Sequence, residues 1–379
     1  MKKRLIIIAI SLVFSFSFIY ASGTAEQGGT GSNNAGNAAE EIHAPDLETL
    51  EGTNAKPIDE SVLACLAAKN SFESALSAND LAEAGNIYMA VSQRQDIDDF
   101  EKYPEIEKTV NQMKAEFESA LSAYSFEVTS KPSVPVKGKA FNKPFAVKIL
   151  HNGKPAAGTN VCVTYPAIAS DGGKISAKKI IASNADGIVS FESPAYNATV
   201  NSILTFSLDL DPALSELVNL PKAEIPFKVM TNMRASGGSI AIVDFSKADK
   251  PITTNSETSS AVLTALINRG FTSIGNCDFT TEVASGSDAK VQKAAQELFG
   301  GSVTYLVYGT IKYVTADKVD EGYKIVLKTD VKVRNVKLNR ELVVCNFETT
   351  GVAKSEWAAL NSCRKAIAEQ IADSIMFGM

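Results

Sequence analysis

The sequence predicts a multi-domain protein in which a small helical hairpin is followed by a β-sandwich and then by an α+β domain. Three observations lead to this prediction. Apolar residues recur at helical spacing over residues 57–125, alternate with other residues over 126–232, and switch between the two patterns over 237–379. The length of 379 residues fits two or three domains, at roughly 150 residues per domain.

The start of the chain is typical of export. Three basic residues at positions 2–4 precede an apolar run from Leu5 to Tyr20, and small residues follow it. We predict a signal peptide over 1–23 and, from the Gly, Ser and Asn content, a flexible linker over 24–56. An uncleaved membrane anchor is the alternative, although the apolar run is shorter than the roughly 20 residues that a spanning helix needs. After cleavage we expect no transmembrane segment. The sequence near the cleavage point has no cysteine, which argues against a lipid-anchored amino terminus.

Residues 57–125 are predicted to form helices. Pro104 suits the first turn of a helix, where its missing N–H costs nothing. The helix that follows carries one apolar stripe, made by Ile106, Val110, Met113, Phe117 and Leu121. We expect a small helical hairpin packed on the next domain.

Residues 126–232 follow the period of two that β-strands have. Short alternating segments such as Phe145 to Ile149 and Leu204 to Leu208 are separated by the turn signals Asn152-Gly153 and Asp186-Gly187. Strands of this length and spacing predict a β-sandwich. The turn Asn152-Gly153-Lys154-Pro155, with the later run from Ala185 to Phe191, resembles bacterial immunoglobulin-like domains of envelope proteins. That resemblance implies a spacer or adhesion-type module without chemistry of its own.

Residues 237–379 are predicted to form an α+β domain of order βαβαβββα. The predicted elements are a strand over 239–245, a helix from Asn255-Ser256 to Gly270, a strand over 271–274, a helix from Asp288 to Gly300, three strands over 303–314, 323–333 and 342–350, and a final helix from Ser355.

This order, with the strand from Ile240 to Phe245 and the strand from Tyr305 to Ile311, resembles a group of envelope domains. The group includes the amino-terminal domain of TolB, CsgG-like curli-secretion proteins and the middle domain of the flagellar-motor protein FlgT. The resemblance implies a periplasmic or outer-membrane-associated assembly role without enzymatic activity. CsgG-type pores add membrane-spanning hairpins, and the strands of this chain lack the alternation such hairpins need.

Composition and motifs favour binding over catalysis. The net charge of −6 and the pI near 5.3 argue against nucleic acid as a partner. The two histidines are His43, in the linker, and His151, and we find no phosphate-binding loop, nucleophile motif or zinc-ligand spacing. We therefore predict no catalytic residues, no cofactor and no metal. Of the five cysteines, Cys345 and Cys363 could form a disulfide in an oxidising compartment, and free thiols are the alternative.

Two features are candidates for a contact surface. Asp244 ends a buried strand, at the edge of an α/β sheet where ligands commonly bind; alternatively, it caps the loop that follows or pairs with a lysine. The strand over 323–334 alternates core residues with a mostly basic set, which could meet an acidic partner or be an ordinary solvated face; this set contains Lys324, Lys328, Lys332 and Arg334. Trp357 is interpreted as a core anchor, with a sugar platform as the alternative.

Taken together, these patterns predict a non-enzymatic exported protein, periplasmic or outer-membrane-associated, that assembles with an envelope protein. A small-ligand or cell-wall glycan binding protein is the alternative, and a hydrolase with paired carboxylates is a third hypothesis.

Overall fold

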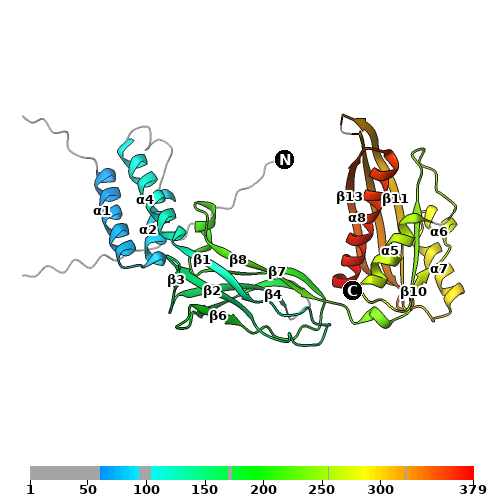
Figure 1. The fold of residues 1–379 in the computed structure, drawn as a ribbon, viewed down its shortest axis with the longest axis horizontal. Coiled ribbons are helices and arrows are strands. Elements are labelled where there is room, and N and C mark those ends of the chain that lie inside the picture. Colours follow the sequence, from blue (N-terminus) through cyan, green and yellow to red (C-terminus); the bar gives the residue numbers. More distant parts are fainter. Residues whose placement is uncertain (1–59, 94–103, 170–172, 255, 321) are drawn as a thin grey trace, which may run out of the picture. The chain divides into compact units, whose positions relative to one another are not determined.

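The computed structural model describes residues 60–93, 104–169, 173–254, 256–320 and 322–379. The predicted signal peptide and linker therefore lie outside the described residues. The described chain is a mixed α/β protein with seven α-helices and three sheets of at least four strands (Figure 1). Among the described residues, no helix is both long and apolar enough to cross a membrane.

Three helices come first, where the sequence predicted a hairpin. Pro104 is the first residue of the third helix, as its fixed backbone angle favours. The predicted apolar stripe of this helix is largely buried, because four of its five members face the core. The helices are α1 (Glu60–Ser77), α2 (Leu81–Gln93) and α4 (Pro104–Ser122).

The next eight strands form two sheets. In one sheet β1, β2 and β3 are neighbours and β6 also pairs with β2, while the other has the order β5-β4-β7-β8. All the pairings between these strands are antiparallel. The strands are β1 (Tyr124–Ser130), β2 (Phe145–His151), β3 (Lys154–Pro155), β4 (Asn160–Ile168), β5 (Lys174–Ala182), β6 (Ile188–Phe191), β7 (Val200–Leu208) and β8 (Lys222–Val229).

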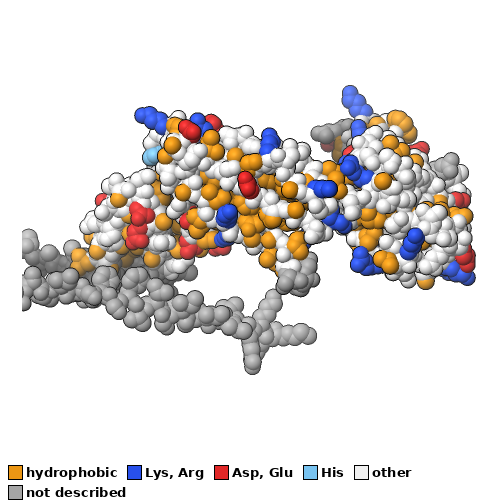
Figure 2. All heavy atoms as spheres, turned by 90° about the horizontal axis from the view of Figure 1, so that it is seen from below, with side chains coloured by type: hydrophobic (Ala, Val, Ile, Leu, Met, Phe, Trp, Pro, Cys, Tyr) orange, Lys and Arg blue, Asp and Glu red, His pale blue; other side chains and the backbone are white. Residues whose placement is uncertain are grey.

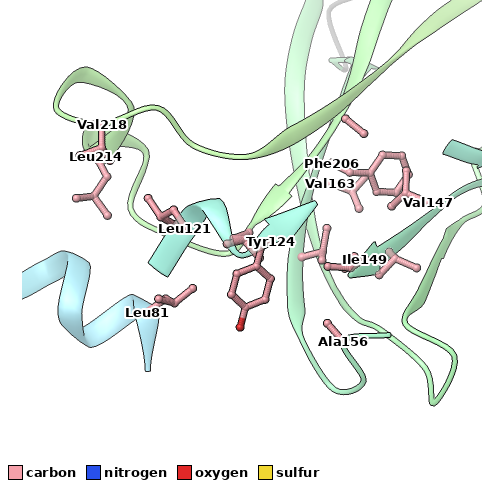
Figure 3. Packing of buried hydrophobic residues seen from close by; sticks show 14 of the residues in the cluster. Leu81, Leu121, Tyr124, Val147, Ile149, Ala156, Val163, Phe206, Leu214 and Val218 are labelled. Atoms are coloured by element: carbon pink, nitrogen blue, oxygen red, sulfur yellow. The ribbon is translucent and has the colours of Figure 1, made fainter. Parts of the chain in front are cut away.

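One hydrophobic core joins the helices to the two sheets. The connection between β7 and β8 contains the short 3-10 helix η1 (Pro212–Glu216), which contributes the fully buried Leu214 to this core. Figure 3 shows Leu214 and Val218 gathered near Leu81 and Leu121 of the helices. Gly85 of α2 allows this approach, since a Cβ there would lie 2.6 Å from Leu214 Cδ1.

The carboxyl-terminal domain has a five-stranded sheet of order β10-β9-β11-β12-β13. Strand β9, second in this order, pairs in parallel with β10 and β11, and the β11-β12-β13 ribbon is antiparallel. The strands are β9 (Gly238–Asp244), β10 (Ile274–Asn276), β11 (Tyr305–Val319), β12 (Gly322–Asn335) and β13 (Arg340–Ala353).

Helices cover the two faces of this sheet unequally. Helices α5 and α8 share one core with Ile240 and Val307, whereas α6 and α7 share a smaller core with Ala241 and Leu306 on the other face (Figure 1). The short α6 was not among the predicted elements. The helices are α5 (Glu257–Asn268), α6 (Thr280–Ala284), α7 (Asp288–Phe299) and α8 (Glu356–Gly378).

Candidate functional site

Asp244 is the last residue of β9, and its side chain is buried. The carboxylate accepts hydrogen bonds from Ser256 Oγ at 2.8 Å, from Thr258 N at 3.2 Å and from Thr258 Oγ1 at 2.6 Å. Ser256 is also the N-cap of α5, because its Oγ accepts a hydrogen bond from Ser259 N. Asp244 thus ties the beginning of α5 to the end of β9.

Charged groups surround this capped end of β9. Arg364 of α8 forms an ion pair with Glu257, the first residue of α5. Burial raises the pKa of the nearby Tyr313, and the positive charges of Arg364 and Lys247 oppose that rise. These contacts hold α5 and α8 together over the sheet, so they stabilise the fold around Asp244.

The four predicted cations, Lys324, Lys328, Lys332 and Arg334, lie on the opposite face of the sheet from Asp244. Asp244 is the register partner of Ile311, which belongs to the core under α5 and α8. Lys332 is the register partner of Tyr308, which belongs to the core under α6 and α7. The structure therefore does not bring Asp244 and the basic residues into one site.

Lys332 and Arg334 are engaged by Asp288, the first residue of α7. Lys332 Nζ lies 2.8 Å from Asp288 Oδ2, and Arg334 Nη2 lies 3.9 Å from the same oxygen. Burial alone would raise the pKa of Asp288, but the hydrogen-bonded Lys332 and the charge of Arg334 hold that pKa below its usual range. These two cations therefore fasten α7 to β12.

Lys324 and Lys328 are exposed, and acidic residues stand across from both. Asp317 of β11 is opposite Lys324, and Glu348 of β13 is opposite Lys328. On the side that Figure 2 displays, lysine and arginine side chains appear at separate points of the surface. The open face of the ribbon therefore carries charges of both signs, and we name this face, with Lys324, Lys328, Val344, Glu348 and Val352, the ribbon face.

Strand β13 adds an edge that the sequence analysis did not single out. It pairs with β12 and stands last in the strand order of its sheet. Val344 and Val352 project on the ribbon face with 51% and 48% of their surface exposed. The long alternating run was visible in the sequence, but its position at the edge follows only from strand order.

Trp357 is not the core anchor that the sequence predicted, because 71% of its surface is exposed. It is the second residue of α8, and the buried residues of this helix begin two positions later at Ala359. Helical spacing does not explain this exposure, because Leu360, three residues later, packs against the core.

A crevice opens at the carboxyl ends of β9 and β10, where it has a volume of about 560 Å³. It lies between the segment after β9 and the segment after β10, and most of its wall consists of small polar side chains. The lining includes Thr253, Thr254, Ser256, Asn276, Asp278 and Thr280. The sequence analysis pointed to this end of β9 but chose Asp244, whose carboxylate is turned to the start of α5.

The cysteines of the described chain are free thiols, Cys345 and Cys363 included. Burial raises the pKa of both. Cys363 donates to the carbonyl oxygen of Ile325 at 3.4 Å. In the described residues, no three His, Cys, Asp or Glu side chains gather as a metal site would require.

Comparison with known proteins links the carboxyl-terminal domain to one family model. Residues 237–376 match the model described as TP0693-like lipoprotein, C-terminal domain. The match does not confirm the resemblance to TolB, CsgG-like and FlgT domains, which stays a prediction. No curated protein matches the chain.

Similar solved structures are remote. A PelC dodecamer from Paraburkholderia phytofirmans is 11% identical, with a TM-score of 0.26, and the match covers 38% of this chain and 88% of that one. The hypothetical protein CT253 from Chlamydia trachomatis is 9% identical, with a TM-score of 0.24 and coverage of 37% and 98%. The sporulation control protein Spo0M from Bacillus subtilis is 8% identical, with a TM-score of 0.18 and coverage of 67% and 99%.

Proposed function

We propose that this chain is a non-enzymatic exported protein of a bacterial envelope, periplasmic or outer-membrane-associated, that assembles with another envelope protein through its carboxyl-terminal domain. Two observations support the location: the signal-like beginning of the sequence, and the match of residues 237–376 to a lipoprotein domain model. In this proposal the helices and the immunoglobulin-like sandwich serve as a spacer.

The observation that carries the assembly role is the ribbon face with the free edge of β13. An exposed strand edge offers a row of backbone N–H and C=O groups with which another strand can pair, and natural proteins usually protect such edges. Fourteen residues of β13 are in extended conformation, and Val344 and Val352 are half exposed along it. We infer that an envelope partner adds a strand at this edge.

The side chains of the ribbon face define the chemistry of that partner. A strand beside β13 would place apolar residues near Val344 and Val352, and a basic residue near Glu348. Lys324 and Lys328, on the next strand, would meet carboxylates at the rim of the partner. Asp244, Lys332 and Arg334 are each engaged within the domain, so we do not assign them to this contact.

Site-specific photo-crosslinking in cells tests the proposal. We place the crosslinking residue at Val344 or at Val352, and at Leu298 of α7 as a control that is 62% exposed. The expected result is one discrete adduct from the two β13 positions and none from Leu298. Glu348→Lys and the double variant Lys324→Glu/Lys328→Glu should each reduce that adduct by at least fivefold. Equal adduct yields at all three positions would refute assembly at the ribbon face. So would an adduct yield that the charge variants leave unchanged.

A further inference from the structure

The crevice lies where two successive strands send the chain to opposite faces of the sheet. After β9 the chain runs to α5, on the face that α8 also covers, and after β10 it runs to α6 on the other face. Since β9 and β10 are parallel neighbours, their carboxyl ends leave an opening between the two departing segments. Open α/β sheets commonly bind ligands at such a switch point.

The polar side chains of the crevice divide into engaged and available groups. Ser256 Oγ donates to Asp244, and Ser259 Oγ donates to the carbonyl oxygen of Ile242. Among the described residues, no side-chain hydrogen bond uses Thr253, Thr254 or Asn276. These two hydroxyls and one amide, which can each donate and accept, therefore remain free for a ligand.

One carboxylate sets the charge of the crevice. Asp278 accepts a hydrogen bond from Thr280 N at 3.1 Å, and the hydrogen bonds from Thr280 lower the pKa of Asp278, so it is ionised at neutral pH. Among the described lining residues it is the one charged side chain. An anionic ligand would meet this negative charge without a compensating cation, while a ligand rich in hydroxyl groups could donate to the carboxylate.

We propose that the crevice between the ends of β9 and β10 binds a neutral saccharide. Asp278 would accept hydrogen bonds from sugar hydroxyls, while Asn276 and Thr254 would exchange hydrogen bonds with neighbouring ones. Ile252 and Phe279 add an apolar wall for the C–H face of the ring. The volume of about 560 Å³ falls in the range of sites that enclose small organic ligands.

Titration of the full chain with sugars tests this site by ligand-observed NMR and calorimetry. The probes are glucose, N-acetylglucosamine and its disaccharide, with inorganic phosphate as the anionic comparison. We expect saturable binding of at least one neutral sugar and none of phosphate. The double variant Thr254→Val/Asn276→Leu should weaken binding about tenfold or more, because it removes two polar partners.

The control variant Thr272→Val alters an exposed threonine that does not line the crevice, and it should leave the affinity unchanged. Circular dichroism of the double variant verifies that its fold is intact. Absence of saturable binding with all three sugars, or equal affinity in the double variant and the wild type, would overturn the proposal. Because Glu348→Lys changes the ribbon face and not the crevice, it should retain sugar binding, which separates this test from that of the assembly role.

Discussion

Two aspartates show how single side chains of the carboxyl-terminal domain place helices on the sheet. Asp244 accepts hydrogen bonds from the hydroxyl groups of Ser256 and Thr258 at the start of α5. Asp288, at the start of α7, accepts a hydrogen bond from Lys332. Carboxylates are favourable near helix N-termini, where the backbone N–H groups lack partners. The same kind of residue thus anchors one helix on each face.

The contact between Asp288 and Lys332 makes stability depend on pH. The folded-state pKa of Asp288 is lowered from its ordinary value of 3.8, so its stabilising contribution is present above that pH and is lost as the pH falls through the folded pKa. We expect Asp288→Asn to lower the melting temperature at pH 7, and the difference from wild type to shrink below about pH 4. Melting curves recorded from about pH 2.5 to about pH 7 measure this difference. The exposed Asp317→Asn, which removes a carboxylate elsewhere on the same sheet, is the control. A difference for Asp288→Asn that stayed constant down to the lowest pH would contradict the role of Asp288.

For single residues, the sequence predicted the place of a side chain in its strand better than it predicted that side chain's hydrogen-bond partners. Asp244 was expected at the carboxyl end of a buried strand, as a ligand contact, as a cap of the following loop or as the partner of a lysine. Its donors, Ser256 and Thr258, lie on a later helix, so the contacts depend on how α5 folds back. The prediction of Trp357 as a core anchor was wrong: the residue keeps the spacing of the apolar stripe, yet it lies in the first turn of α8 and is 71% exposed.

Elements of regular pattern were predictable, and short ones were not. The buried strand β9 and helices α5 and α7 follow the predicted positions, with Gly300 in the left-handed conformation after α7. Strand β10 begins at Ile274, where a strand over 271–274 was predicted, and Phe271 packs into the core beside Tyr305. Three-residue strands and five-residue helices such as α6 carry too few residues to show a period.

The contact between β9 and β11 depends on one residue without a side chain. A Cβ on Gly238 would lie 2.3 Å from Cζ of the fully buried Tyr305. We therefore expect Gly238→Ala to destabilise the domain by about 2 kcal/mol through overpacking. Adding Tyr305→Leu should recover at least about 1 kcal/mol relative to the sum of the single variants, because the clash then disappears. Urea denaturation followed by circular dichroism and by the fluorescence of Trp357 measures the cycle, and strict additivity would contradict the clash.

On the scale of the whole chain, the described residues of the predicted helical region and the sandwich are packed around one hydrophobic core, with no boundary between them. The domain ranges 57–125 and 126–232 come from a change of period in the sequence, yet their buried residues belong to one core. A hydrogen bond adds to this continuity, since Asn79, which follows α1, donates through Nδ2 to the hydroxyl of Tyr124 in β1 at 3.1 Å. Period reveals local structure, but it carries no information on which segments distant in sequence share a core.

Leu214 tests that continuity. It is fully buried between the helices and the sandwich, so Leu214→Ala should cost about 3 kcal/mol from lost burial and a residual cavity. Hydrogen exchange should then rise both in α2 and in β8, because they share the weakened core. The matched control Ile203→Ala, at a half-exposed position on β7, should change exchange in neither element. Loss of protection in β8 alone would show that the helices fold independently.

The position of Leu214 late in the chain affects how the helices fold during synthesis. Ribosomes deliver α1, α2 and α4 well before the connection between β7 and β8, so these helices emerge with Phe72 and Phe117 still awaiting the residues that complete their core. Until Leu214 and Val218 arrive, that apolar surface is open to chaperones. Truncated versions of the protein for expression should therefore extend at least through Val229, and fragments that stop after Ser122 are expected to aggregate.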